Sequence, residues 1–199
     1  MSLDTEYRRM VGRVGGHLSL SEWSRLRETV AGAKEVLEVG HYTGLSTSAL
    51  LGGMDVSGRL TSVDHHEGDF WIGPSERSYI NDVVKEYSPE DRPQVELVFR
   101  DFRDRVALDM CLGPFDYVFY DADHESRAVH DFWNLYEPRF AGRCVLAFDD
   151  CDWPGMTLLE SLAVKLGGFI DVTERSIFRD RGQKVFSDTY TVRVMKREF

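Results

Sequence analysis

A loop with two glycines follows the first strongly apolar run of the chain. Residues 38–46 have the sequence EVGHYTGLS, with Gly40 and Gly44 four positions apart. This spacing permits a tight turn and close approach of the backbone to a ligand, and the helix that follows offers free N–H groups. The loop lacks the Lys-Ser/Thr ending of a P-loop and the three-glycine spacing of a dinucleotide fingerprint. We therefore expect a ligand with a carboxylate and an ammonium group; a purely structural turn is the alternative.

Asp64 ends the second predicted strand, 24 residues after Gly40. An acid at this place commonly accepts both hydroxyls of a ribose, whereas the alternative is a solvated acid at a strand end. Together the loop and Asp64 predict an adenosine-type cofactor. Asp101 and Phe102 follow the third strand and are expected to contact the adenine. His65, or the adjacent His66, is expected to pack on the same base.

Three aspartates follow two further predicted strands. Asp121 ends the fourth strand, and Asp149 and Asp150 end the fifth. If these strands are neighbours, the three carboxylates converge at the edge of the sheet where open α/β folds bind ligands. Crowded carboxylates repel one another unless they are protonated or bridged by a cation. Hard oxygen ligands suit Mg²⁺ best, with Ca²⁺ or Mn²⁺ as substitutes. Helix capping by Asp150 or Asp152 is the alternative.

The elements that must position these side chains alternate between short apolar runs and helical patterns, which is typical of an α/β fold. Ser19-x-x-Glu22 predicts a capping box before a helix that buries Trp23. Leu158, Leu159, Leu162 and Leu166 are expected to line the core side of the helix that starts at Pro154. Strands are expected over 35–39, 60–63, 95–99, 117–120 and 144–148. Two more, over 169–178 and 188–195, form an antiparallel hairpin that turns near 181–183.

Composition limits the class of protein. The chain has 199 residues, 42% of them hydrophobic, and 24 Lys+Arg against 34 Asp+Glu give a net charge of −10. This predicts one domain (1–199) with a helical segment over 1–34, a cofactor core over 35–168 and a closing hairpin over 169–199. The absence of a basic run disfavours nucleic acid, and no run approaches ~18 apolar residues, so no membrane span is expected. Cys111, Cys144 and Cys151 lack metal-site spacing and predict reduced thiols in a cytoplasmic protein.

Four motifs carry a family resemblance. The segments EVGHYTGLST (38–47), YDADH (120–124) and FDDCDWPG (148–155), with Asp64, resemble class I S-adenosylmethionine-dependent methyltransferases over about residues 15–199. The chain is most similar to catechol and macrocin O-methyltransferase-like small-molecule enzymes. The resemblance implies a Rossmann-like, seven-stranded, mostly parallel sheet in the order 3-2-1-4-5-7-6, with helices on both faces.

The resemblance also implies a set of site residues. S-adenosylmethionine is expected to be held by Glu38, Gly40, Tyr42, Thr43, Gly44, Ser46, Asp64, His65, Asp101, Phe102 and Asp121, and Mg²⁺ by Asp121, Asp149 and Asp150. His124, together with Asp121, is expected to be catalytic, with the imidazole as the base that takes the acceptor's proton near neutral pH. Catechol-type relatives have a lysine at this offset, whereas the macrocin-like group often has a DxDH motif. A surface or capping histidine is the alternative.

The predicted activity is a metal-assisted methyl transfer to a hydroxyl group of a small molecule. Trp153 is expected to touch this acceptor, and residues 67–74 are expected to form a lid, a subunit contact or a packed loop. The short segment 1–18 leaves little room for a recognition domain, which favours a homodimer. A non-catalytic ligand-binding relative and, less favoured, a nucleotide-dependent dehydrogenase are the alternatives.

Overall fold

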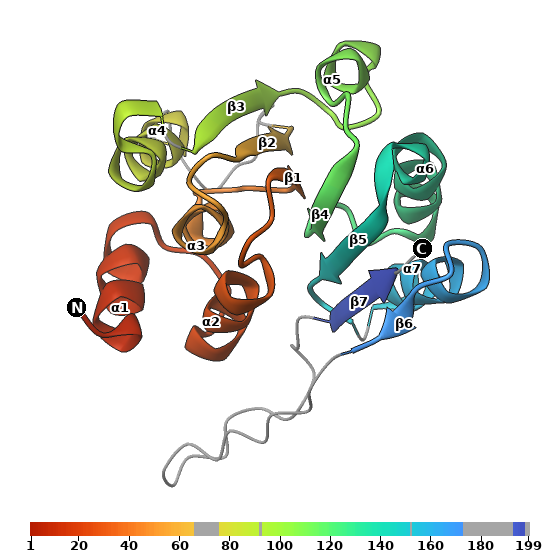
Figure 1. Cartoon of the computed structure of the whole chain (residues 1–199), viewed down its shortest axis with the longest axis horizontal. Coiled ribbons are helices and arrows are strands. Elements are labelled where there is room, and N and C mark those ends of the chain that lie inside the picture. Colours follow the sequence, from red (N-terminus) through yellow and green to blue (C-terminus); the bar gives the residue numbers. More distant parts are fainter. Residues whose placement is uncertain (66–75, 92, 152, 173–192, 198–199) are drawn as a thin grey trace, which may run out of the picture.

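The protein is built on one seven-stranded sheet with the strand order β3-β2-β1-β4-β5-β7-β6 (Figure 1). The structure is a computed structural model that describes residues 1–65, 76–91, 93–151, 153–172 and 193–197. Strands β1 to β5 run parallel, and β7 is antiparallel to both β5 and β6. The strands are β1 (Glu35–Val39), β2 (Arg59–Asp64), β3 (Gln94–Phe99), β4 (Phe115–Tyr120), β5 (Phe140–Phe148), β6 (Ile170–Asp171) and β7 (Arg193–Arg197).

Helices cover both faces of the sheet (Figure 1). One face carries α1 (Leu3–Val14), α2 (Leu20–Thr29), α3 (Leu45–Gly53) and α4 (Glu76–Tyr87). The other face carries α5 (Arg105–Met110), α6 (Ser126–Tyr136) and α7 (Pro154–Lys165), and short 3₁₀ turns lie at Pro89–Asp91 and Glu137–Arg139. The predicted fold and strand order are confirmed, as is the antiparallel pairing at the C-terminal end. The predicted hairpin turn at 181–183 and the segment 67–74, predicted as a lid, a subunit contact or a packed loop, lie outside the described residues.

The last four residues of strand β4, 117–120, are all buried and largely apolar because helices cover both faces of the sheet. Tyr117 and Phe119 pack in the core beneath α1–α4, whereas Val118 and Tyr120 pack in the core beneath α5–α7. Successive strand residues point to opposite faces, so a central strand with helices on both sides needs apolar side chains at every position. The strand therefore ends with its backbone fixed on both sides, directly before Asp121.

Helix α2 starts as predicted. The Ser19 hydroxyl accepts the Glu22 N–H at 3.3 Å, and the Glu22 carboxylate accepts the Ser19 N–H at 2.7 Å. Trp23 is completely buried, and its indole N–H donates to the Ser48 hydroxyl of α3 at 2.9 Å. This contact fastens α2 to α3 and fixes the position of Glu22.

Two expectations about core elements are wrong in detail. Leu166 is 71% exposed, because α7 ends at Lys165 and Leu166 is its C-cap. The core side of α7 carries Met156, Leu159 and Ala163, and Leu158 and Leu162 pack against the same core as predicted. Strand β5 begins at Phe140, four residues earlier than expected.

Two further observations concern the described residues. Cys111, Cys144 and Cys151 are all free thiols. Among the helices that the structure describes, none has the length and apolar character needed to cross a membrane.

The register of the sheet aligns the strand ends that precede the candidate residues. Val39 of β1 lies opposite Val63 of β2 and Tyr120 of β4, and Tyr120 in turn lies opposite Phe148 of β5. The residues that follow these positions therefore meet at one edge of the sheet.

Candidate active site

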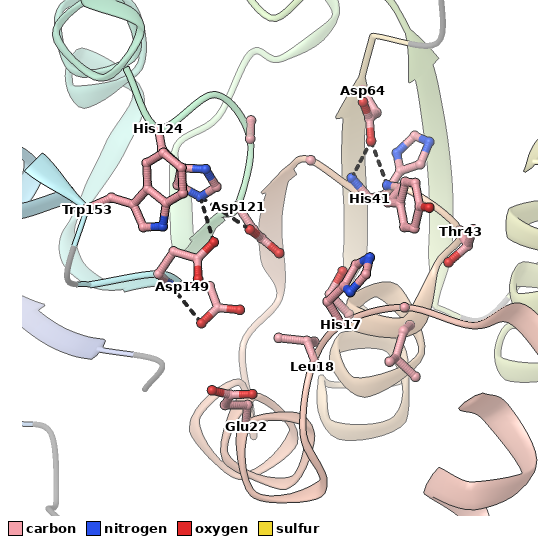
Figure 2. A pocket seen from close by; sticks show the side chains of 17 residues that line it. His17, Leu18, Glu22, His41, Thr43, Asp64, Asp121, His124, Asp149 and Trp153 are labelled. Atoms are coloured by element: carbon pink, nitrogen blue, oxygen red, sulfur yellow. Dashed lines mark hydrogen bonds and ion pairs between the residues drawn. The ribbon is translucent and has the colours of Figure 1, made fainter. Parts of the chain in front are cut away.

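A pocket of about 680 Å³ lies at this edge (Figure 2). Its lining comes from the loop before α2 and the first turn of that helix, from the loop after β1, and from the ends of β2, β4 and β5. The lining residues are Gly16, His17, Leu18, Glu22, Gly40, His41, Tyr42, Thr43, Leu45, Ser46, Asp64, Asp121, Ala122, His124, Asp149, Asp150 and Trp153. A second pocket of about 240 Å³ shares Gly40, Asp64 and Ala122 with the first. The two pockets thus meet at the glycine loop.

Gly40 allows the ends of β1 and β4 to approach closely. It has a φ of +95°, and a Cβ atom built on it would lie 2.0 Å from the carbonyl oxygen of Asp121. Any other residue would be strained and would push the two strand ends apart. The predicted tight turn is therefore a requirement of the fold.

Asp64 holds the glycine loop in place. Its Oδ2 atom accepts the backbone N–H groups of His41 at 2.8 Å and Tyr42 at 2.6 Å. Figure 2 shows these two bonds at the end of the pocket opposite His124. A carboxylate has about four acceptor positions, so Asp64 keeps capacity for further donors. The loop and the acid that were predicted to act together are thus bonded to each other.

Glu38 lies beneath the loop and does not line either pocket. It is completely buried and accepts hydroxyl groups from Ser46 at 2.7 Å, Thr47 at 2.8 Å and Ser62 at 2.6 Å. Burial raises the pKa of the Glu38 carboxyl to about 7, although these hydroxyls oppose the shift. Of the predicted cofactor residues, Glu38 and Gly44 line neither pocket, whereas Tyr42, Thr43 and Ser46 line the larger one.

The residues predicted to contact adenine gather in the smaller pocket. His65, Asp101 and Phe102 line it together with Asp64, while His66 lies outside the described residues. The carbonyl of Phe102 accepts the Tyr136 hydroxyl at 2.8 Å, which anchors this segment to α6. Asp101 accepts two bonds from the Arg103 guanidinium, at 2.9 and 2.7 Å, and this hydrogen bonding lowers the pKa of its carboxyl. The sequence did not indicate that Asp101 already has this partner.

A cluster of acids surrounds His124 at the other end of the larger pocket. Asp121, His124 and Asp150 each offer a ligand atom within 4.8 Å of the others. His124 Nε2 lies 3.7 Å from Asp121 Oδ1 and 3.4 Å from Asp150 Oδ2. Asp149 was predicted as the third metal ligand, but the group that the structure brings together contains His124 in its place. Asp149 lies beside this group, 8% exposed, and its Oδ1 accepts the Asp150 N–H at 2.9 Å.

The electrostatics of this cluster show an excess of negative charge. Burial raises the pKa of the Asp149 carboxyl to about 8, and the nearby charges of Asp121 and Glu22 add to the shift. Burial, together with Asp150 and Asp121, also raises the pKa of Glu22. For His124, burial lowers the pKa, but Asp121 and Asp150 outweigh this effect and raise it above its ordinary value. All three pKa shifts favour the binding of a proton at this end of the pocket.

The start of α7 packs tightly against the His124 segment. A Cβ atom on Gly155 would lie 2.0 Å from the carbonyl oxygen of His124, so glycine is required here too. The N-cap of α7 is Trp153, so Asp150 does not take the N-cap position, and Asp152 lies outside the described residues. The Trp153 ring lies 5.4 Å from the His124 ring and is 50% exposed in the pocket, where an acceptor contact was predicted.

Sequence reasoning missed the contribution of the N-terminal segment. Gly16, His17 and Leu18 from the loop before α2, and Glu22 from its first turn, line the larger pocket. Only Glu22 carried a signal, and that signal was the capping box. Its place on the pocket wall follows from the packing of α2 on α3.

Comparisons with known proteins identify the family and the fold of the chain. The model of a family described as a methyltransferase domain matches residues 37–151. No curated protein is significantly similar in sequence to the chain.

Several solved structures share the fold. The cofactor-bound protein Rv0187 from MTB is 17% identical with a TM-score of 0.70, over 99% of this chain and 90% of that one. The O-methyltransferase from Bacillus cereus in complex with S-adenosylhomocysteine is 17% identical with a TM-score of 0.69, over 98% and 89%. TomG, an O-methyltransferase from Streptomyces achromogenes in complex with S-adenosylmethionine, is 15% identical with a TM-score of 0.61, over 98% and 88%. The Rossmann-like methyltransferase fold is therefore confirmed.

The buried Glu38 generates a prediction about pH. Its pKa is about 7 in the folded protein against an ordinary value of 4.5, so the folded state binds a proton that the unfolded state releases between these values. This contribution to stability is complete below about pH 4.5 and is lost as the pH rises through 7. Relative to Glu38→Gln, the free energy of unfolding of the native protein should fall by about 3 kcal/mol across this range. Urea denaturation at a series of pH values measures it.

The exposed Glu28 of α2 provides the control. Glu28→Gln removes the same charge and should follow the native pH profile. A constant difference between the native protein and Glu38→Gln from pH 4.5 to 7 would show that folding does not raise the pKa of Glu38.

Proposed function

Because the chain belongs to this methyltransferase-domain family, we propose that it transfers the methyl group of S-adenosylmethionine to a hydroxyl group of a small molecule. The observation that carries the proposal is the position of Asp121, His124 and Asp150 in the same pocket as the glycine loop and Asp64. A donor site and a proton-accepting site are thereby adjacent. The complexes of two structural neighbours, the Bacillus cereus O-methyltransferase with S-adenosylhomocysteine and TomG with S-adenosylmethionine, support the choice of cofactor.

The two pockets suit the two halves of this cofactor. The smaller pocket, with Phe102 and His65, offers apolar and ring surfaces for adenine. Asp64 lies where the pockets meet, so its carboxylate can accept the ribose hydroxyls between them. The larger pocket then takes the methionine half beside Tyr42, Thr43 and the start of α3, where helix N–H groups favour a carboxylate.

The acid cluster fits a divalent cation. Carboxylate oxygens from Asp121 and Asp150 lie close together in a partly buried site, and Mg²⁺ and Mn²⁺ prefer such ligands. A bound cation would lower the pKa of the acceptor hydroxyl and fix it in line with the sulfonium methyl group. We propose Asp121 and Asp150 as ligands, and Asp149 stays a predicted third ligand.

His124 is proposed as the base. Its Nε2 atom lies near the carboxylates of Asp121 and Asp150, and these carboxylates would stabilise the imidazolium that forms when the ring accepts the hydroxyl proton. A nitrogen that binds the cation cannot also accept this proton, so the roles of base and metal ligand exclude each other. Trp153, which packs beside His124, offers an exposed ring to the acceptor. The acceptor itself and the expected homodimer stay predictions.

The cofactor assignment is tested at Asp64. Replacing Asp64 by Ala removes the acceptor for the ribose hydroxyls and for the two loop N–H groups. S-adenosylhomocysteine should bind more weakly by ~1.5–3 kcal/mol, the value of a charge-assisted contact. Isothermal titration calorimetry measures this affinity, and Asp109→Ala, a highly exposed acid of α5, is the matched control. Equal affinities of the native protein and Asp64→Ala would rule out the ribose assignment.

The metal assignment is tested with two variants. Asp150→Asn should weaken Mn²⁺ binding by at least about tenfold, because it removes an anionic ligand. His124→Ala should keep the Mn²⁺ affinity but lower the rate of methyl transfer by roughly 10²–10⁴-fold, as for a lost general base. Titration calorimetry with Mn²⁺ and a transfer assay over a panel of phenols and sugars give both quantities. Loss of Mn²⁺ binding in His124→Ala would make His124 a ligand instead of the base.

A further inference from the structure

Glu22 lines the larger pocket, and one of its carboxylate oxygens has no hydrogen-bond partner among the described residues. The residue is 5% exposed and lines the pocket. Its Oε2 atom accepts the Ser19 N–H in the capping box, whereas its Oε1 atom is buried and has no hydrogen-bond partner among the described residues. Figure 2 shows the Glu22 side chain on α2, directed into the cavity on the side of Asp149 and away from Asp64. A buried oxygen without a partner costs free energy, and a bound ligand can remove this cost.

The surroundings of Glu22 define the charge of that ligand. Within the described part of the chain, the wall of the pocket contains no lysine or arginine. It contains five acids, which are Glu22, Asp64, Asp121, Asp149 and Asp150. Carboxylates this close repel one another unless a positive charge lies between them. An anionic group in this position would be repelled by the same acids.

The other four acids already have roles or partners. Asp64 accepts the two loop N–H groups, and Asp149 accepts the Asp150 N–H. In the proposed function, Asp121 and Asp150 bind a divalent cation. Oε1 of Glu22 therefore remains as the acceptor for which the wall of the pocket supplies no donor.

We propose that Glu22 binds an ammonium group of a ligand in the pocket and thereby selects cationic over anionic ligands. This inference rests on the proposed function, because that function supplies two sources of the group. One source is the amino group of the methionine half of S-adenosylmethionine, and the other is an amine on the methyl acceptor. An ammonium has three donors and can bind Oε1 while Oε2 stays in the capping box.

Glu22→Gln is the variant that isolates the charge. Glutamine has nearly the same shape and keeps the capping box, since a Gln at this helix position accepts the same N–H. Glu28→Gln, an exposed position on the same helix, is the matched control for a lost negative charge. Thermal unfolding of both variants checks that α2 remains folded.

Titration calorimetry with Mg²⁺ present separates the two sources. The first arm compares S-adenosylhomocysteine with 5′-methylthioadenosine, which lacks the amino acid half. If the cofactor supplies the ammonium, Glu22→Gln lowers the affinity for S-adenosylhomocysteine by about 10- to 100-fold and leaves the affinity for methylthioadenosine unchanged.

The second arm keeps S-adenosylhomocysteine saturating and compares dopamine with 3,4-dihydroxyphenylacetate, which have the same ring and opposite charges. If the acceptor supplies the ammonium, the native protein prefers dopamine. Glu22→Gln then lowers the affinity for dopamine by about 10- to 100-fold, while the affinity for S-adenosylhomocysteine stays the same.

The proposal is overturned if the ligand affinities of Glu22→Gln and Glu28→Gln agree within twofold in both arms. This includes the case where neither catechol binds. Glu22 would then serve the capping box alone. A native protein that binds neither S-adenosylhomocysteine nor methylthioadenosine would instead contradict the proposed function. The two failures are therefore distinct.

Discussion

The close contact between Gly40 and the carbonyl of Asp121 determines how the site is arranged. With no side chain at Gly40, the ends of β1 and β4 lie side by side in the register that pairs Val39 with Tyr120. The chain after β1 can then turn toward Asp64, while the chain after β4 brings Asp121 and His124 to the same pocket. A bulkier residue would separate the half of the pocket suited to a cofactor from the half that carries the acids.

The buried core makes this arrangement rigid enough to hold like charges together. Strand β4 is packed on both faces, and Gly155 brings the start of α7 against the backbone of His124. The acids of the pocket therefore cannot move apart to relieve their repulsion. Burial is the main cause of the raised pKa values of Asp149 and Glu22, and this repulsion adds to it. A site with this excess of negative charge favours cations, whether a metal ion, the sulfonium of the cofactor or an ammonium group.

The sequence predicted the parts of the site that depend on strand ends. Asp64, Asp121 and Asp149 follow apolar runs, and parallel strands bring such residues to one edge, so their proximity could be predicted. The strand order came from the family resemblance, because periodicity alone does not show which strands are neighbours.

Other features depend on local conformation and tertiary packing. Asp150 has a φ of +51°, which turns the chain after β5, and the structure groups Asp121 and Asp150 with His124 instead of Asp149. No residue pattern indicates this turn. Glu22 was predicted as a capping residue, but its place on the pocket wall depends on the Trp23–Ser48 contact between α2 and α3. Leu166 fits the apolar stripe of α7 but lies just beyond its last turn.

We propose that an adenosine-type methyl donor and a divalent cation share this pocket. The most direct measurement is thermal unfolding of metal-stripped protein with S-adenosylhomocysteine, NAD⁺, Mg²⁺ and the nucleotide–metal pairs. A ligand at about 100 times its dissociation constant adds ~2.7 kcal/mol of stability. We expect S-adenosylhomocysteine to stabilise the protein and NAD⁺ to leave its stability unchanged. Adding Mg²⁺ to the S-adenosylhomocysteine complex should increase the stability further. Stabilisation by NAD⁺ alone, or by no ligand in the panel, would contradict the proposal.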